Sequence, residues 1–289
     1  MGLLKINGNK GWIIKVLQSL LAIFLICITI SPVLYIFLNS LKSNEEYITS
    51  KFAIPHYPIK SFISNLNVMK ENGIFRYLMN SSVVAMCVVT LNTLFVSLAG
   101  FSFSKLKFPG KNYIYWGVIG LLAIPTQVFV VPLYVLYGKL NMVDNIFALA
   151  LIYATLDFPT GSFLMTSFYR GIPNELLDSA QIDGANSFQI YYKIMLPLGR
   201  PAIIAIAIIN FFWCWNDLFI ALIFNRTHIS RLITPFIAIF NEETRAGLSF
   251  TNWPLIFNGS IISLIIPLII YMIFQNRLVE GLTVGAVKG

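Results

Sequence analysis

Charged side chains are scarce in this sequence. Lys, Arg, Asp and Glu together make up 11% of its 289 residues, whereas hydrophobic residues make up 57%. Soluble domains carry about 25% charged residues, and the mean hydropathy of this chain is +0.76. A soluble fold cannot hide that much apolar surface, so the composition predicts a membrane protein with several spans.

Thiol and imidazole groups are also few. The three cysteines, Cys27, Cys87 and Cys214, lie inside apolar runs, and no two of them form a Cys-x-x-Cys pair. The two histidines, His56 and His228, are isolated from one another. This number and spacing argue against a disulfide framework and against a metal site.

Nucleotide-binding and catalytic motifs are missing as well. Gly110-Lys111 is followed by Asn112, and no glycine precedes it at the P-loop distance. The sequence therefore offers no phosphate cradle. No catalytic constellation is present either, so we expect this chain to contribute no catalytic, cofactor-binding or metal-binding residue.

Uncharged or nearly uncharged stretches are long enough to cross a bilayer, which takes about 20 helical residues. We place spans at about 13–39, 79–104, 113–137, 145–169, 201–224 and 256–276. The sequence thus predicts an all-α polytopic membrane protein with six transmembrane helices in a single domain over residues 1–289. Prolines inside the spans predict kinks rather than breaks, because neighbouring helices satisfy the freed backbone groups. These prolines are Pro32, Pro125, Pro132, Pro159 and Pro267.

Basic residues mostly edge the spans, which accounts for the formal net charge of +8 without a nucleic-acid partner. The basic excess is larger in the segments that are internal when the N-terminus is cytoplasmic. The cluster Lys105, Lys107 and Lys111 marks the clearest inner loop. The positive-inside rule then predicts that both termini are cytoplasmic. The segments expected outside are about 42–76, 139–144 and 225–255.

A polar segment at residues 172–201 separates the fourth and fifth spans. Pro173 suits the first position of a helix, and Glu175 falls in the first turn, where the helix dipole favours an anion. Gly184 stands where a helix commonly ends in a left-handed residue. The apolar side of this helix is expected to comprise Leu176, Leu177, Ala180 and Ile182.

A second short helix is expected directly after that glycine. Asn186 or Ser187 suits its N-cap, and Pro197 is expected to stop it. The local sequence therefore predicts two short helices that meet at a glycine corner.

The spacing in this segment resembles the EAA loop of the permease subunits of ATP-binding-cassette importers. The matched positions are Asp178, Ser179, Ala180, Gly184, Ile194, Leu196 and Pro197. Asp178 stands in place of the family's Glu, and Ser179 in place of its Ala. The resemblance implies that this helical loop, together with Glu175, couples the permease to a groove on a separate ATPase subunit. On its local chemistry alone, the segment also fits an ordinary structured cytoplasmic loop of another polytopic protein.

Other segments resemble the carbohydrate, or maltose-type, branch of that family and its second permease subunit. They are Asn80-Ser81, residues 97–105 and 107–110, Trp215-Asn216-Asp217 and the tail 281–289. The resemblance implies half of a translocation pathway for a sugar in a prokaryotic inner membrane. It implies as partners two ATP-binding subunits that use ATP and Mg, a second permease subunit in a heterodimer, and an extracytoplasmic solute-binding protein.

Polar residues inside the spans suggest where a solute passes. Asn210, Trp213 and Asp217 recur at i, i+3 and i+7, which is one face of a helix, while Gln127 and Asp157 fall near mid-span. A charge at the bilayer centre costs about 2.5–3.5 kcal/mol on insertion scales, so it normally faces a cavity or a partner. These residues either line a sugar path or tie helices together by hydrogen bonds.

Our hypothesis from the sequence is a permease subunit of an ATP-driven, binding-protein-dependent importer, and not an enzyme. Two other classes stay open, an ion-coupled secondary transporter and a purely structural membrane subunit. Secondary transporters often contain inverted repeats, and the two halves of this sequence show none. The sequence does not distinguish among mono-, di- and oligosaccharides, polyols and glycerol phosphates.

Overall fold

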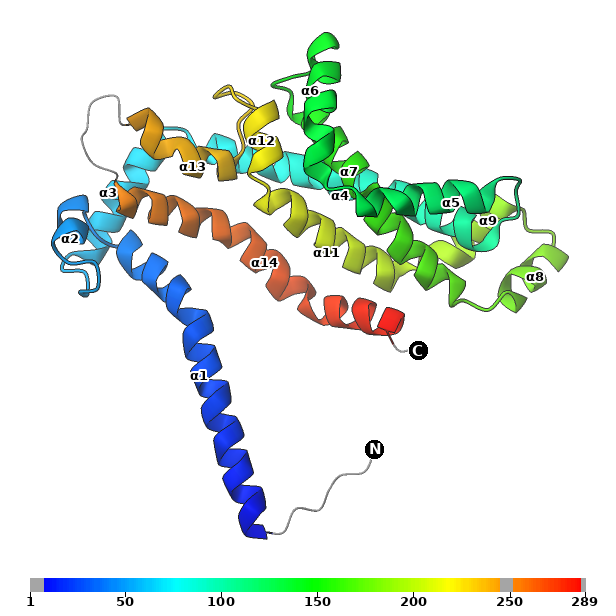
Figure 1. Cartoon of the computed structure of the whole chain (residues 1–289), viewed down its shortest axis with the longest axis horizontal. Helices are drawn as coiled ribbons and strands as arrows, with labels where there is room; N and C mark the ends of the chain where they lie inside the picture. The colour runs from blue at the N-terminus through cyan, green and yellow to red at the C-terminus, as the bar shows by residue number, and fades with distance from the viewer. Residues whose placement is uncertain (1–7, 245–251, 287–289) are drawn as a thin grey trace. The chain divides into compact units, whose positions relative to one another are not determined.

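The computed structural model describes residues 8–244 and 252–286, and within them it contains helices and no strand. The chain forms two compact units. Unit 1 comprises the chain up to Asn72 together with Phe240–Ile262, and unit 2 comprises Gly73–Ile239 and the residues from Ser263 onward. The prediction of an all-α polytopic fold is confirmed, and Figure 1 shows the helices in chain order.

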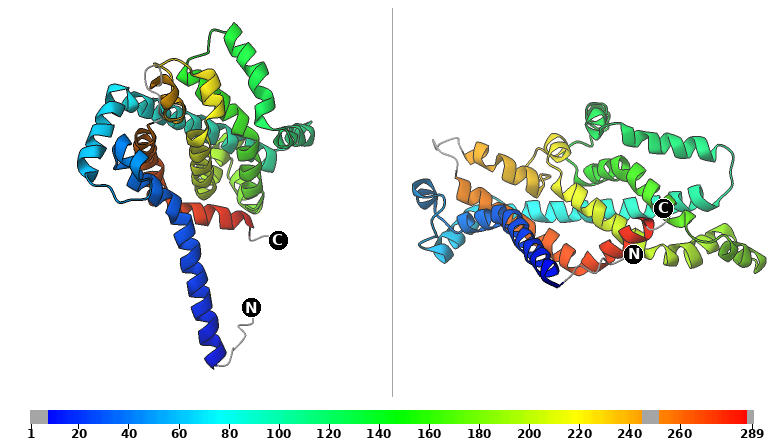
Figure 2. Two further views of the ribbon diagram at one scale, coloured as in Figure 1. Left: turned by 60° about the vertical axis from the view of Figure 1, so that its left-hand side comes forward. Right: turned by 60° about the horizontal axis from the view of Figure 1, so that its bottom comes forward.

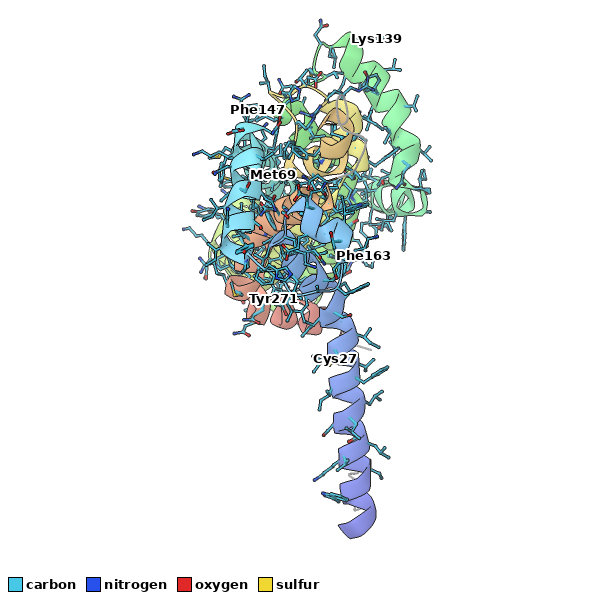
Figure 3. All side chains as sticks on the ribbon, turned by 90° about the vertical axis from the view of Figure 1, so that its left-hand side faces the viewer. Cys27, Met69, Lys139, Phe147, Phe163 and Tyr271 are labelled. Carbon is cyan, nitrogen blue, oxygen red and sulfur yellow. The ribbon has the colours of Figure 1, made fainter. Side chains whose placement is uncertain are left out.

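Unit 1 opens with α1 (Gly8–Ser40), followed by α2 (Asn44–Thr49) and α3 (Pro58–Glu71). The side chain of Ser43 caps α2, and Pro58 occupies the first turn of α3, where a missing N–H costs nothing. In the most apolar window of the span within α1, no residue is buried inside the molecule. The side chains of α1, Cys27 among them, project from the ribbon along its length (Figure 3), as expected of a helix that meets lipid or another protein.

A buried lysine fastens the end of α1 to the loops that follow it. Lys42 is fully buried, and its ammonium donates to the carbonyl oxygens of Ser50 and Lys51 at 3.0 and 3.2 Å. Burial lowers the pKa of Lys42, against the opposing charge of Glu46. Asn65 of α3 donates to the Lys42 carbonyl at 3.0 Å. These bonds satisfy polar groups that would otherwise be costly to bury.

The core of unit 2 is built from α4 (Ile74–Lys105), α7 (Ile146–Arg170) and α11 (Arg200–Asn216). In Figures 1 and 2 the cyan α4 and green α7 run side by side, and α11 also packs against α4. Two glycines allow the close approach of α4 and α7. A Cβ at Gly100 would lie 2.7 Å from Met165 Cγ, and one at Gly161 would lie 2.7 Å from Val96 Cγ1.

The Asn80-Ser81 pair at the start of α4 holds the chain that leads into α13 (Ile233–Thr244). The Asn80 amide donates to the carbonyl of Ile229 at 2.8 Å and to that of Arg231 at 2.9 Å. The hydroxyl of Ser81 accepts from the N–H of Ile233 at 2.9 Å. This part of the carbohydrate-branch resemblance therefore has a structural explanation. The helix α13 itself, in the segment expected to be an outer loop, was not predicted.

A second polar cluster closes the loop between α6 (Val130–Lys139) and α7. Asp144 has a φ of +61°, and its Oδ1 accepts from the N–H of Arg226, the N–H of Thr227 and the hydroxyl of Ser230. Partial burial acts to raise the pKa of Asp144. The hydrogen bonds from Thr227, Arg226 and Ser230 outweigh that effect and hold the pKa below its ordinary value.

The third span is broken at proline, so the expectation of a kink at Pro125 is wrong. Here α5 (Lys111–Gly120) and η1 (Leu121–Ala123) meet η2 (Thr126–Phe129) and α6 at an angle of 100°. Ile124 is extended, with φ −98° and ψ 121°, because the proline ring that follows it disfavours the helical region. Continuous helices do pass through Pro32, Pro159 and Pro267, as expected.

The fifth span is also interrupted. The helix α11 ends at Asn216, Asp217 is extended, and α12 (Phe219–Phe224) follows. The last helix, α14 (Trp253–Ala286), contains the sixth span.

Within the described part of the chain, four helices are long and apolar enough to span a membrane, and each of two bent pairs adds one more if it counts as a single span. The four are Ile14–Ser40, Ile74–Lys105, Ile146–Arg170 and Trp253–Asn276. The bent pairs are Lys111–Ala123 with Thr126–Lys139, and Ser187–Leu198 with Arg200–Asn216. These segments overlap the six predicted spans. The cytoplasmic placement of Met1 and Gly289 stays a prediction, and both residues lie outside the described part of the chain.

Candidate functional site

The polar segment between α7 and α11 folds as two short helical pieces joined at Gly184. The first is α8 (Glu175–Ile182), and Gly184 has a φ of +83°. This left-handed corner is the one expected for glycine after a helix. Pro173 precedes α8 by two residues and is not its first helical residue, because Asn174 is the N-cap.

The second piece comprises α9 (Ser187–Ile190), a π turn η3 (Tyr191–Met195) and α10 (Leu196–Leu198). Asn186 is the N-cap: its side chain accepts from the Gln189 N–H, and the Gln189 side chain accepts from the Asn186 N–H, both at 2.9 Å. This is a capping box, which satisfies two donors at once. Of the two candidates for the cap, Asn186 and Ser187, the structure has Asn186.

Pro197 does not stop this helix, so that expectation is wrong. The wider π turn directly before Pro197 relieves the clash that a proline ring makes with the carbonyl four residues earlier. The chain turns at Gly199, where Ser187–Leu198 and Arg200–Asn216 meet at 73°. A Cβ at Gly199 would lie 2.7 Å from the Tyr169 hydroxyl, so the corner needs glycine.

The loop is mounted on the core of unit 2 by buried apolar contacts. Leu177, Ile190, Tyr191 and Met195 are buried in one cluster with residues of the three core helices. The core-helix members of that cluster are Val96, Phe101, Met165, Tyr169, Ala202 and Ile206. Ala180 and Leu196 of the EAA-like motif pack against the same cluster. Burial at this scale makes the loop a rigid extension of the bundle.

Two polar contacts reinforce this mount. The ammonium of Lys105, at the end of α4, donates to the carbonyl of Ile172 at 2.5 Å and to Asn174 Oδ1 at 2.8 Å. The hydroxyl groups of Ser97 and Tyr191 lie 2.7 Å apart. Both contacts join α4 to the loop over long distances in sequence.

The outer face of the loop carries large apolar side chains that nothing in unit 2 covers. Ile182 is 86% exposed and Phe188 is 71% exposed, and Leu176 and Tyr192 are also exposed. Exposed apolar groups gathered on a polar segment typically mark an interaction surface. Among the motif residues, Asp178 and Ser179 face outward, as does Glu175. The exposure of Phe188 was not predicted, although a phenylalanine two residues after the capping residue Asn186 in a polar loop was a usable signal.

The polar residues predicted inside the spans divide into two groups. Gln127, Asp157 and Trp213 line a single cavity of about 450 Å³ beside the break at Pro125. Asn210 and Asp217 do not line it. The structure therefore brings three of the five together and gives the other two different contacts.

Asn210 and Asp217 join helices. The Asn210 amide donates to Asn92 Oδ1 at 2.8 Å, and the Asn92 amide donates to the carbonyl of Ala154 at 3.1 Å. These bonds tie α11 to α4 and α4 to α7. Their geometry is that of interhelical hydrogen bonding.

Asp217 holds both an aromatic side chain and a helix start. Its Oδ2 accepts from the hydroxyl of Tyr153 at 2.7 Å and from the N–H groups of Ile220 and Ala221 at 3.0 Å. The ring of Tyr153 meets the ring of Trp213 edge to face, with centroids 5.5 Å apart. Asp217 thus acts on the cavity indirectly, through Tyr153 and Trp213.

Among the described residues, no cluster of three or more His, Cys, Asp or Glu side chains is placed to hold a metal ion. The described helices thus form apolar, partly broken candidate spans with an anchored helical loop, the architecture of a polytopic membrane protein.

Comparison with known proteins gives the family. Residues 93–284 match the family model described as "Binding-protein-dependent transport system inner membrane component", and the chain belongs to this family. It is a permease subunit of a binding-protein-dependent importer, which confirms the prediction of a transport subunit rather than an enzyme.

Individual relatives agree with this assignment. An ABC transporter permease protein of Caldicellulosiruptor sp. (strain Rt8B.4) is 34% identical over 89% of this chain and 91% of its own length. The alpha-glucoside transport system permease protein AglG of Rhizobium meliloti (strain 1021) is 32% identical over 77% of this chain and 59% of its own length. Among solved structures, a chain of a bacterial ABC transporter involved in the import of the acidic polysaccharide alginate superposes with a TM-score of 0.80. It is 20% identical, and the match covers 94% of this chain and 98% of that one.

Proposed function

We propose that this chain forms half of the translocation pathway of an ATP-driven carbohydrate importer and couples to separate ATPase subunits through residues 172–201. The observation that carries the proposal is the loop itself. Its outer face presents Ile182 and Phe188 to a partner, while its inner face is packed into the core of unit 2. A loop with an exposed apolar face and a buried inner face can pass a displacement from a bound partner to the helices of the core.

The coupling step follows from this mount. When two ATPase subunits close on ATP, each loop moves with the subunit that holds it. Because Leu177, Tyr191 and Met195 are buried against the core helices, the displacement passes to those helices instead of being absorbed within the loop. The bundle then changes between inward-facing and outward-facing packings, which is a switch between two discrete states.

ATP and Mg are bound by the partner subunits in this proposal. The full assembly comprises two ATP-binding subunits, this chain, a second and different permease subunit, and an extracytoplasmic solute-binding protein. It lies in the inner membrane of a prokaryote, with both termini of this chain in the cytoplasm.

The carbohydrate assignment rests on two supports. AglG, a relative at 32% identity, is named as an alpha-glucoside permease. The segments Asn80-Ser81 and Trp215-Asn216-Asp217 resemble the carbohydrate branch, and the structure gives Asn80, Ser81 and Asp217 specific hydrogen bonds.

Reconstitution tests the proposal. The complex in proteoliposomes is expected to take up a sugar only with ATP inside and loaded binding protein outside. Phe188→Asp is expected to release the ATPase subunits or abolish stimulated hydrolysis. Tyr113→Asp, which alters a still more exposed aromatic residue on α5, is expected to leave both intact. Uptake driven by an ion gradient without ATP would favour the secondary-transporter alternative and overturn the proposal.

A further inference from the structure

A cavity beside the broken third span combines features of a ligand site. It has a volume of about 450 Å³, within the range of about 300–1,000 Å³ typical of small-molecule pockets. Its walls are mostly apolar, and its polar groups come from three separate segments. These groups are Thr126, Gln127, Thr155, Asp157, Thr160 and Trp213.

Asp157 is the most unusual member of this set. Its side chain is 6% exposed, and its Oδ2 atom is buried and has no hydrogen-bond partner among the described residues. Buried carboxylate oxygens are nearly always satisfied, so an unpaired oxygen directly behind a cavity wall points to a donor supplied from outside the chain.

Trp213 supplies an apolar face at the same cavity, and its position is fixed. Tyr153 meets Trp213 edge to face, and the hydroxyl of Tyr153 is held by Asp217. Asp217 therefore orients the Trp213 indole through Tyr153. Such ordering is expected where an aromatic ring takes part in recognition, because a pre-organised side chain loses little entropy on binding.

Gln127 adds an amide from the segment directly after Pro125. That segment is a 3-10 turn preceded by extended backbone, so its amide and carbonyl groups are not all used in helical bonds. The break therefore adds Gln127 to the polar residues that line the cavity.

We propose that this cavity is a binding subsite for one hydroxyl-rich ring of the transported solute. The Asp157 carboxyl group accepts hydrogen bonds from solute hydroxyl groups, Gln127 binds a further hydroxyl, and Trp213 packs against the C–H face of the ring. Asp217 and Tyr153 are positioning residues for Trp213. The inference rests on the proposed carbohydrate substrate, and it assigns this chain its own solute contacts.

Protection from chemical labelling tests the subsite in the complete complex. The complex that contains Thr155→Cys, in a background without Cys27, Cys87 and Cys214, is trapped with ATP and vanadate. One sample contains binding protein isolated with its natural solute, identified by mass spectrometry, and the other contains the same protein stripped of solute. Maleimide labelling at position 155 is expected to fall several-fold only with the loaded protein. Thr90→Cys, an exposed position on α4 outside the cavity, is expected to label equally in both.

Equal labelling of Thr155→Cys in the two samples overturns the proposal. Protection by sodium ions alone also overturns it and assigns the cavity to a cation. If the solute is protective but is not a carbohydrate, the proposed substrate class fails while the subsite stands, so the two failures are distinguishable.

Substitutions separate recognition from structure. Asp157→Asn is expected to reduce uptake roughly tenfold, which is the scale of one lost charged hydrogen bond, with ATPase stimulation by loaded binding protein unchanged. Trp213→Leu is also expected to reduce uptake without changing that stimulation, because it removes the aromatic face. Tyr153→Phe is expected to reduce uptake less, because the ring contact remains. Parallel loss of assembly, stimulation and uptake in Asp157→Asn would instead assign Asp157 a structural role and refute the recognition role.

Discussion

The hydroxyl groups of Ser97 and Tyr191 lie 2.7 Å apart although 94 positions separate them in the sequence. Ser97 also bonds the carbonyl of Leu94 at 3.0 Å. A hydroxyl has one proton to donate, so Ser97 donates to Leu94 and accepts from Tyr191. This directional bond joins the π turn of the coupling loop to the C-terminal third of α4.

Removing that bond is expected to loosen the loop without unfolding it. Tyr191→Phe keeps the ring in contact with Phe101 and deletes only the donor, so we expect a loss of about 1 kcal/mol in stability. Thermal unfolding of the purified complex measures this loss. Combined with Ser97→Ala, the two changes are expected to be non-additive, since they remove one shared interaction. Fully additive losses would show that the two hydroxyl groups act separately.

Lys105 is expected to be needed for coupling, in contrast to its neighbour Lys107. Lys105→Met removes both bonds to Ile172 and Asn174 and leaves the stem in place, so the start of the loop gains mobility. We expect faster hydrogen exchange in residues 172–182 and weaker ATPase stimulation by loaded binding protein. Lys107→Met, an exposed change in the same hairpin, serves as the control. Identical behaviour of the two variants would show that the hydrogen bonds from Lys105 to the loop are not needed for coupling.

Substitutions at Gly184 can distinguish two reasons for a glycine there, the left-handed backbone conformation and the space available in a partner's groove. A Cβ there meets nothing within 4 Å in this chain, so Gly184→Ala costs only the left-handed backbone, about 1–2 kcal/mol. Asn tolerates that conformation better than Ala. If conformation is what matters, Gly184→Asn retains more ATPase co-purification than Gly184→Ala. If a close-fitting groove on the partner is what matters, the larger Asn performs worse, and the order of the two variants reverses.

Asp144 is expected to make stability depend on acid. Its pKa is lower in the folded state, so its contribution is complete above the unfolded value of about 3.9 and is lost as the pH falls through the folded value. Asp144→Ala also loses three hydrogen bonds at a left-handed residue, and we expect a cost of about 2 kcal/mol. Asp144→Asn is expected to cost about half as much, because Asn keeps an acceptor and tolerates the backbone. Thermal unfolding at neutral and acidic pH tests both points, and an unchanged acid dependence in Asp144→Asn would contradict the assignment.

Topology is testable at two exposed positions. Lys60→Cys on α3 and Gln181→Cys on α8 are placed in a background without the three native cysteines. An impermeant maleimide applied to intact cells, with any outer membrane permeabilised, is expected to label position 60 and not position 181. The opposite pattern would reverse the orientation that the positive-inside rule predicts.

Local chemistry explains which parts of the coupling loop were predictable. Gly184 and Asn186 act through their own backbone and side chain, so a corner and a cap follow from residue type alone. The outcome at Pro197 depends on the π turn before it, a hydrogen-bond pattern that no residue in Tyr191–Met195 announces. The burial of Leu177 beside the exposure of Leu176 likewise depends on where the core helices lie.

Prolines in the spans show the same division. Pro159 and Pro125 are alike in sequence terms, yet α7 runs through the first and the third span breaks at the second. Pro159 is buried in a helix packed along α4, whereas Ile124 and Pro125 are exposed, so less packing opposes a break there. The prediction that Asn210, Trp213 and Asp217 share one helical face likewise assumed a helix that continues through Asp217. In the structure α11 ends at Asn216.

The close contacts at Gly100 and Gly161 have a consequence for motion. The Met165 side chain of α7 packs against Gly100 of α4, and the Val96 side chain of α4 packs against Gly161 of α7. If α4 slid or rolled against α7, both side chains would clash with the backbone of the neighbouring helix. Spin labels on these two helices should therefore report one fixed separation through the transport cycle, and the bending that opens a pathway is left to the joints at Pro125, Gly199 and Asp217.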